Sequence, residues 1–589
     1  MNPPAAAPPD GLALWLERTI GLFGFYELVL TALFLLLAFT APQLGRRGFE
    51  RIEHYFDGLA RHPHHGVHQI IAVGLLAVLA RAAMLPWLGA PVALNFDENS
   101  IVLQAQTFMQ GRLANPTHPF WEHFETFYVN QVPAYASMYF PGRGAPLYAG
   151  LLLAGNAWVG VWLSVVLLCM AATWMLQAWV SLPMAFLGGV LVVLRLGVFS
   201  FWTNSYYGGA FTAFGAMLVF GALGRILKEP RWRDGALMGL GAVILMLSRP
   251  YEGMLLCVPV AVAVLLRWRK PAWQAGRRAI VKVALPAVLL VGAGGGLLLA
   301  YNAATTGHIL KSAYSLQRET YAIAPAFLTS PPVVSKHQGP AYFRAYYEIE
   351  ATTYHYRESA AKLVRSVVAK LLHTWNFYIG TTFAAAFLAG LWVARREGLL
   401  TGTLAFFFLG YCLETWNFPQ STGPIYPVLL VLTMRGFEWL RARGASGLFL
   451  TRAMPVAAAL LLALPATSVV AGWPSLSSVS VQAVCCTINY DEVRPALLRQ
   501  LQASPGPDLV LVKDGPQNPT NYELVYNDAD IDRAEVVWAH RLGPEKDQRL
   551  QAYFSGRRVW EFEWLPKPPD ADQGYRFTPI SPGGDSRAP

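Results

Sequence analysis

Long apolar runs separated by short polar connections recur along most of this chain. A hydrocarbon core about 30 Å thick is crossed by a helix of roughly 20 apolar residues, because only a helix satisfies its backbone hydrogen bonds internally. The pattern therefore predicts an α-helical polytopic membrane protein with about twelve transmembrane helices. The expected spans lie near residues 20–41, 68–89, 157–180, 181–199, 209–227, 235–249, 253–267, 283–300, 375–393, 399–416, 424–440 and 452–472.

Basic residues gather in alternate connections between these runs. Short loops rich in Arg and Lys stay on the cytoplasmic side of a membrane, because these residues resist translocation. The loops contain Arg46, Arg47, Arg51 and Arg61; Arg225, Lys228, Arg231 and Arg233; Arg267, Arg269, Lys270, Arg277, Arg278 and Lys282; and Arg395, Arg396, Arg441 and Arg443. We therefore expect both termini and the connections 90–156, 200–208, 301–374 and 417–423 on the outer face.

The chain after residue 472 changes from apolar runs to shorter mixed elements. Its pattern predicts helices near 491–502 and 544–554 and strands near 508–513, 535–540 and 557–564, which is typical of a small α/β domain. The expected division is an extra N-terminal helix with a basic cytoplasmic loop (1–67), a transmembrane core (68–472), a small α/β extracytoplasmic domain (473–565) and a disordered tail (566–589).

Composition agrees with a membrane location. Of the 589 residues, 54% are hydrophobic and 14% are charged, and one soluble core cannot bury so much apolar surface. The net charge of +10 does not indicate nucleic-acid binding, because Lys and Arg lie between apolar runs rather than on one polar face. The five cysteines lack the spacing of a metal site, and the adjacent Cys485 and Cys486 are assigned no function. The sequence also lacks the phosphate-binding glycine motifs of nucleotide-driven enzymes.

Two adjacent carboxylates, Asp97 and Glu98, stand directly outside the second span in Asn95-Phe96-Asp97-Glu98-Asn99-Ser100. A carboxylate at the low-dielectric boundary can have a raised proton affinity and act as a general base toward a hydroxyl. The competing interpretation is a helix start, where acidic residues face the positive end of the helix dipole. Asp97 and Glu98 are the catalytic candidates.

Three cations on the same face are candidates for binding the phosphate of a donor. Arg143 lies between two glycines that let a ligand approach the backbone. Arg249 occupies the turn Ser248-Arg249-Pro250, and Lys311 follows the span that ends near residue 300. A lipid-headgroup anchor is the alternative for Arg143 and Lys311, and an Arg–Glu pair that locks two helices is the alternative for Arg249.

The turn of residues 201–209 is rich in hydroxyl, amide and aromatic groups. Aromatic faces stack on sugar rings while amides and hydroxyls bond sugar hydroxyls, although an interfacial aromatic belt has the same composition. The candidate sugar or acceptor contacts are Asn204, Tyr206, Tyr207, Glu252 and His308.

Some ionisable residues fall within or beside spans. A charge there is costly, so each indicates either a function or a partner that neutralises it. The residues concerned are Glu27, Arg81, Arg195 and Glu414, together with Arg249 and Glu252.

These features together resemble the GT-C superfamily of membrane glycosyltransferases, in the branch of protein O-mannosyltransferases and lipid A aminoarabinose transferases. Phe96-Asp97-Glu98 matches the acidic motif of that branch, and Ser137-Met138-Tyr139-Phe140-Pro141 with Pro146-Leu147 looks like the end of its first loop. The strings 204–209, 248–253 and 526–530 are similar to segments of uncharacterised bacterial members.

The resemblance implies an enzyme of the bacterial inner (plasma) membrane that moves a sugar from a polyprenyl-phosphate donor to a lipid, glycan or protein acceptor on the outer face. It implies that Asp97 activates or orients the acceptor, with Glu98 as a helper. A divalent metal ion is compatible with the carboxylates, but no spacing requires one. The alternatives are a transporter or flippase of a lipid-linked sugar and a non-catalytic membrane assembly subunit.

Overall fold

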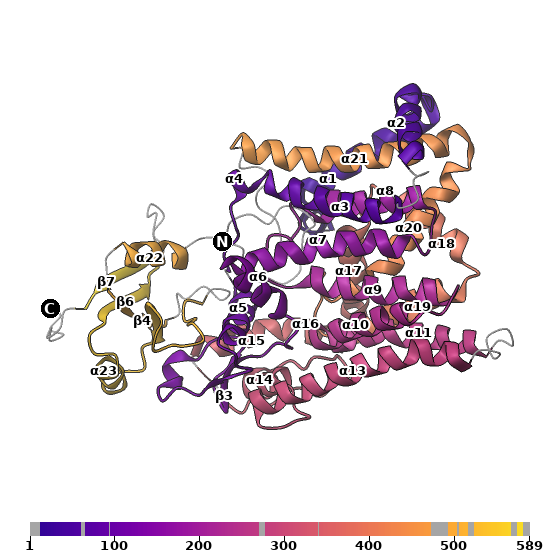
Figure 1. The fold of residues 1–589 in the computed structure, drawn as a ribbon. Coiled ribbons are helices and arrows are strands. Elements are labelled where there is room, and N and C mark those ends of the chain that lie inside the picture. Colours follow the sequence, from indigo (N-terminus) through magenta and orange to yellow (C-terminus); the bar gives the residue numbers. More distant parts are fainter. Residues whose placement is uncertain are drawn as a thin grey trace.

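The computed structural model describes residues 12–59, 65–93, 95–269, 277–337, 339, 341–472, 493–503, 506–515, 523–566 and 574–580. Figure 1 shows long helices that run side by side, with α5 (Phe96–Met109), α14 (Ala313–Tyr321), α15 (Ala341–Glu350) and the strands at one end and α2 (Arg46–Leu59) at the other. This is the architecture of a multi-pass membrane protein. Cys485 and Cys486 lie outside the described residues.

Seven described helices are long and apolar enough to cross a membrane. They are α1 (Leu12–Thr40), α3 (His65–Ala82), α7 (Ala157–Leu176), α9 (Gly209–Ile226), α11 (Pro250–Trp268), α13 (Arg277–Thr306) and α21 (Gly444–Val470). Shorter apolar helices accompany them: α6 (Ala145–Ala154), α8 (Leu182–Leu196), α18 (Ala384–Ala394) and α19 (Gly398–Tyr411). Two more bundle helices are α10 (Trp232–Ser248) and α20 (Tyr426–Arg441). The expected count of twelve spans stays a prediction.

Helix α9 occupies the centre of the bundle. Buried residues make up 83% of its apolar window, against 11% for the window of α13. Glycines let α9 and α10 approach closely, since a Cβ on Gly241 would lie 2.5 Å from the carbonyl oxygen of Gly215. Small residues at such crossings favour packing between membrane helices, where no hydrophobic effect drives association.

The expected span 375–393 is wrong. Helix α17 (Ala360–Tyr378) begins fifteen residues earlier and α18 begins only at Ala384, so a turn of residues 379–383 interrupts the predicted run. Gly380 in this turn has a φ of +63°, and a Cβ there would lie 2.0 Å from Oε1 of Glu27 on α1. Close approach to another helix therefore sets the break, which an apolar pattern does not reveal.

The connection between α3 and α6 folds into compact structure at the end of the bundle. It contains α4 (Leu85–Leu88), α5, η1 (Trp121–Phe124) and a three-stranded antiparallel sheet in the order β1-β3-β2, formed by β1 (Asn115–Pro116), β2 (Val129–Asn130) and β3 (Ala134–Ser137). Helix α5 begins at Phe96, because the Asn95 side chain accepts a hydrogen bond from the Glu98 amide at 3.1 Å. The acidic pair is thus the first helical turn.

Short helices complete the connections at the same end of the bundle. The segment between α14 and α17 contains α15, α16 (Thr352–His355) and η2 (Tyr356–Glu358), and η3 (Gly423–Ile425) leads into α20. Helix α15 packs on the start of α5, where the ring centres of Tyr346 and Phe96 lie 5.1 Å apart.

The C-terminal sheet consists of four strands in the order β5-β4-β6-β7. Strands β4 (Asp508–Lys513), β5 (Val536–His540) and β6 (Arg558–Trp564) are parallel, and β7 (Tyr575–Pro579) pairs antiparallel with β6. Helices α22 (Val493–Gln502) and α23 (Pro544–Tyr553) accompany them. Strand β7 lies within the stretch 566–589 that was expected to be disordered, so the expectation is wrong for residues 575–579. These residues are ordered because Tyr575 packs on Phe562 and Phe577 packs on Trp560.

The C-terminal sheet docks on the connection that contains α5. Gln106 of α5 donates to Asp528 Oδ1 at 2.8 Å, and the Tyr135 hydroxyl of β3 donates to the Asn527 carbonyl at 2.9 Å. His540 of β5 is buried and donates from Nε2 to the Glu125 carbonyl at 2.8 Å. Segments more than 390 residues apart are therefore joined beside the acidic pair.

Candidate functional site

Asp97 lies in the first turn of α5 and is held by two phenols. The Tyr139 hydroxyl donates to its Oδ1, and the Tyr207 hydroxyl donates to its Oδ2 at 3.1 Å. Tyr139 follows β3 and Tyr207 precedes α9, so the carboxylate joins three separate segments of chain. Both carboxylate oxygens are thereby fixed in direction at the end of the helical bundle.

The surroundings of Asp97 favour proton uptake. Burial raises the pKa of its carboxyl above the ordinary value, while hydrogen bonds from Tyr139 and Tyr207 and the charges of Arg143 and Arg249 oppose the rise. A carboxyl whose pKa moves toward neutrality is better suited to accept a proton from a hydroxyl.

Glu98 points to a different partner. Its Oε1 accepts a hydrogen bond from the Tyr206 amide at 2.9 Å, and the side chain is buried. Tyr206 in turn donates its hydroxyl to the Pro91 carbonyl at 2.7 Å. Glu98 therefore holds the turn that carries Tyr207, which makes it a positioning residue for Asp97 in this structure.

Arg143 lies beside Asp97 on the segment that follows β3. Its Nη1 donates to the Tyr207 carbonyl at 3.0 Å, and its guanidinium carbon stands 4.7 Å from the centre of the Tyr139 ring. Burial and the nearby charge of Arg249 lower the pKa of Arg143 to about 10, so it remains charged at neutral pH. The two tyrosines whose hydroxyls bind Asp97 thus also hold this cation, one through its backbone carbonyl and the other through its ring face.

Arg249 occupies the junction of α10 and α11. Its Nη1 donates to Glu252 Oε1 at 2.6 Å and to the Ser421 hydroxyl at 2.8 Å. The junction lies at the same level as Arg143, because the Gly142 amide donates to the Leu247 carbonyl at 2.8 Å. The Arg–Glu pair expected as an alternative does exist, within one turn of helix, and Ser421 is the partner that joins Arg249 to another segment.

A further carboxyl, Glu414, faces Arg249 from the connection before η3. Burial and the charge of Glu252 raise the pKa of Glu414 well above its ordinary value, against the charges of Arg249 and Lys370. Its backbone is fixed by a bridge to Phe327 and by Lys370 Nζ, which donates to the Glu414 carbonyl at 2.5 Å. The sequence marked Glu414 only as a costly charge near a span.

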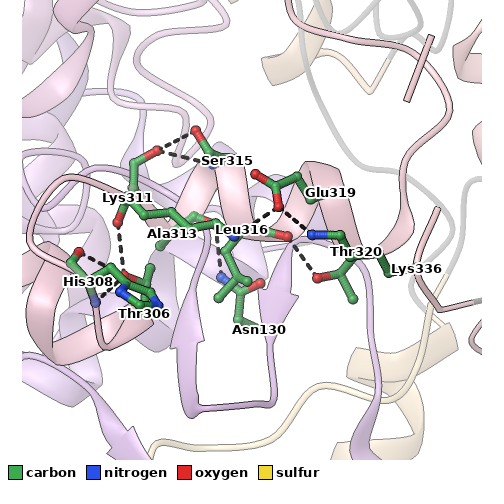
Figure 2. Close-up of polar contacts among 11 residues, drawn as sticks. Asn130, Thr306, His308, Lys311, Ala313, Ser315, Leu316, Glu319, Thr320 and Lys336 are labelled. Carbon is green, nitrogen blue, oxygen red and sulfur yellow. Dashed lines mark hydrogen bonds and ion pairs between the residues drawn. The ribbon is translucent and has the colours of Figure 1, made fainter. Parts of the chain in front are cut away.

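Lys311 belongs to a separate cluster beyond the end of α13. Its Nζ lies 2.9 Å from Glu319 Oε2, and Lys336 Nζ lies 2.7 Å from the same oxygen, as Figure 2 shows. No interaction among the described residues joins Lys311 to Asp97, Arg143 or Arg249. The assignment of Lys311 to the donor phosphate stays a prediction.

Other sequence candidates are engaged elsewhere. Asn204 donates to the Val198 and Ser200 carbonyls at 2.8 and 3.1 Å and accepts from Arg81 Nη2 at 3.3 Å, so its amide stabilises its own turn. His308 is exposed, and its backbone amide donates to Thr306 Oγ1 at 3.1 Å. Two of the predicted sugar contacts do lie beside the catalytic and phosphate-binding candidates: Tyr207 contacts Asp97, and Glu252 contacts Arg249.

A resident metal ion has no fitting set of ligands among the described residues. No group of three or more His, Cys, Asp or Glu side chains within that part of the chain is placed to hold one. Asp97 accepts from two phenols and Glu98 turns away to Tyr206, so the acidic pair does not converge on one point.

No family model and no curated protein matches this chain. Among solved structures, it is similar to ArnT from Cupriavidus metallidurans bound to undecaprenyl phosphate, with a TM-score of 0.47 and 13% identity, covering 85% of this chain and 94% of ArnT. It is also similar to the Archaeoglobus fulgidus oligosaccharyltransferase tethered with an acceptor peptide, with a TM-score of 0.45 and 9% identity, covering 85% of this chain and 69% of that one. At such values these likenesses carry no argument about function.

Proposed function

We propose that this chain is a glycosyltransferase of the GT-C type, which moves a sugar from a polyprenyl-phosphate donor to an acceptor hydroxyl on the outer face of the membrane. The observation that carries the proposal is one proton acceptor, Asp97, beside two guanidinium groups, Arg143 and Arg249, at one end of an apolar helical bundle. Glycosyl transfer from a phosphate needs a base for the acceptor and positive charge for the leaving group.

The reaction is a single displacement at the anomeric carbon. The acceptor oxygen forms a bond to that carbon while its proton passes to the Asp97 carboxylate. The bond from the carbon to the phosphate oxygen breaks, and its electron pair stays on the departing lipid phosphate. Arg143 and Arg249 stabilise this charge. The interaction is strengthened because Arg143 is buried and only 14% of the Arg249 side chain is exposed, so that little water screens it. Configuration at the anomeric carbon is inverted.

The side of the membrane follows from the basic connections. Helix α9 starts at Gly209, two residues after Tyr207 of the site, and its 18 residues carry the chain about 27 Å to Ile226. The Arg-rich connection after Ile226 therefore belongs to the opposite end of the bundle from Asp97. Because such connections stay cytoplasmic, we place Asp97 and the C-terminal sheet on the outer face of a bacterial plasma membrane.

Two of the predicted sugar contacts fit this reaction. Tyr207 and Glu252 are held by Asp97 and Arg249, respectively, so both lie beside the groups that act on acceptor and donor. We propose that they bond hydroxyls of the transferred sugar.

The test is transfer by the purified chain in liposomes that contain a polyprenyl-phosphate sugar. We expect release of free polyprenyl phosphate together with a glycosylated acceptor. Arg249→Ala should raise the donor KM about tenfold or more, because a largely enclosed cation that contacts phosphate is lost. The matched control is Arg344→Ala, which removes an exposed guanidinium paired with Glu348 and should leave KM unchanged.

The rival functions give different results in the same liposomes. A transporter or flippase moves the labelled lipid between leaflets without cleaving it, and an assembly subunit neither moves nor cleaves it. Either result from the wild-type chain, with acceptors of all three classes supplied, contradicts the proposal.

A further inference from the structure

A tight turn follows α13, the longest of the described helices. The apolar window of α13 runs from Val281 to Thr306, and its 26 residues span about 39 Å, more than a hydrocarbon core of about 30 Å. Gly307 then takes a φ of +75° and ends the helix. The window is thus long enough to carry residues 307–311 past the hydrocarbon core to the level of the lipid headgroups.

The turn is fixed by hydrogen bonds that its backbone carbonyls accept from side chains at the end of α13. Thr306 Oγ1 lies 3.0 Å from the carbonyl oxygens of both His308 and Lys311, and Asn302 Nδ2 donates to the Ile309 carbonyl at 3.1 Å. Figure 2 shows Thr306 beside His308 and Lys311. The conformation of the turn is thus set by Asn302 and Thr306, the residues of α13 that precede it.

This fixed turn presents two large apolar side chains outward. Ile309 is 58% exposed and Leu310 is 85% exposed. Exposure of such side chains to water is unfavourable by about 25 cal/mol per Å² of apolar surface, whereas at the headgroup level they can enter the acyl chains. The turn therefore has the form of a small membrane-inserted tip.

Two lysines stand next to this tip and share one carboxylate. Lys311 and Lys336 both contact Glu319 Oε2, and their charges lower the pKa of Glu319 below its ordinary value. Two positive charges against one negative charge leave the cluster with a net charge of +1. The side chains remain accessible, with 28% of Lys311 and 67% of Lys336 exposed.

We propose that the tip and its lysine pair form a binding site for the phosphate of an anionic phospholipid, separate from the site at Asp97. The ammonium groups of Lys311 and Lys336 contact the headgroup phosphate, while Ile309 and Leu310 lie among the acyl chains. The net positive charge favours an anionic lipid over a zwitterionic one. The inference is independent of the proposed glycosyl transfer, because no described contact links this cluster to Asp97, Arg143 or Arg249.

The test is native mass spectrometry of the full chain in detergent with added phosphatidylglycerol or phosphatidylcholine. We expect the wild type to retain phosphatidylglycerol preferentially, and Lys311→Ala with Lys336→Ala to weaken that retention about tenfold. Glu319→Gln removes the shared negative charge and should strengthen it. This opposite change keeps the test decisive even if the double variant folds poorly.

The matched control is the double variant Lys513→Ala with Arg576→Ala. These two cations share Glu563 on the C-terminal sheet in the same way, at 2.7 and 3.5 Å, and we expect their removal to leave lipid retention unchanged. Equal loss in both double variants, or preference that survives loss of Lys311 and Lys336, overturns the proposal. The proposal is also overturned if this cluster binds undecaprenyl phosphate or inorganic phosphate but does not bind phosphatidylglycerol.

Discussion

The Tyr207 hydroxyl donates to Asp97 Oδ2 at 3.1 Å and so joins the turn before α9 to the first turn of α5. Arg143 donates to the backbone carbonyl of the same tyrosine. One residue thereby holds both the proposed base and a proposed phosphate-binding cation. The relative position of acid and cation, on which the proposed reaction depends, is set by this turn.

Tyr207→Phe should shift the pH dependence of sugar transfer. The lost hydrogen bond favours ionised Asp97, so its removal raises the pKa of that carboxyl further. Because transfer needs the ionised form, the acid limb of kcat/KM should move to higher pH by about one unit. Tyr206→Phe is the control, since its hydroxyl bonds Pro91 and not Asp97. An acid limb that stays in place, or moves to lower pH, contradicts the role given to Tyr207.

His540 should make docking of the C-terminal sheet weaken at alkaline pH. Its ring nitrogens lie 2.8 Å from the Glu125 carbonyl and 2.8 Å from Asp514 Oδ2, both acceptors, so both nitrogens carry protons. The charges of Asp514 and Glu523 outweigh burial and raise the pKa of His540 to about 9. This raised folded-state pKa contributes stability that is fully present below about pH 6.5 and is lost as pH rises through about 9.

The measurement is the rate at which a protease releases the C-terminal sheet, followed from pH 6.5 to pH 10. We expect the wild type to become more susceptible across this window, and His540→Gln to be susceptible throughout. His118→Gln is the control, because His118 joins the same two parts of the chain but contacts an exposed carboxylate, Asp532, which precedes β5. Release that is equally slow at both ends of the range excludes the buried imidazolium.

Loss of Arg195 should destabilise the bundle more than loss of its whole ion pair. Arg195 Nη1 donates to Glu27 Oε1 at 3.1 Å, and both side chains are buried between α8 and α1. Arg195→Leu leaves Glu27 as a buried uncompensated charge, which costs about 3–5 kcal/mol. Adding Glu27→Leu should restore much of that loss. Thermal unfolding of the wild type and the two variants in detergent decides this, and a double variant less stable than Arg195→Leu contradicts it.

Much of the fold follows from the apolar pattern. The strand predicted at 508–513 is β4 as observed, and the helices predicted near 157–180 and 209–227 are α7 and α9. Helix α17 is not predicted, because Lys362, Arg365 and Lys370 interrupt its apolar residues and the sequence there has no continuous apolar run. The turn at Gly380 depends on contact with Glu27, about 350 residues away, and such contacts leave no local signal.

Some of the candidate residues named from the sequence lie together in the structure. Asp97, Arg143, Arg249, Tyr207 and Glu252 do gather in one cluster. The sequence does not predict that Asp97 contacts Tyr139 and Tyr207 while Glu98 contacts the Tyr206 amide. The directions of the two side chains depend on the start of α5 at Phe96. The sequence offered no reason to select Tyr139 from the many interfacial tyrosines, although it lies in the string that carried the family resemblance.

Asp97→Asn tests the central claim most directly, with turnover measured at saturating lipid-linked sugar and acceptor. The amide is nearly isosteric but cannot take the acceptor proton, so turnover should fall by about 10²–10⁴-fold while donor binding and unfolding temperature stay the same. Glu98→Gln is the control, because it keeps the oxygen that accepts from the Tyr206 amide and should retain most of the turnover. Near wild-type turnover of the Asp97→Asn chain would contradict the account.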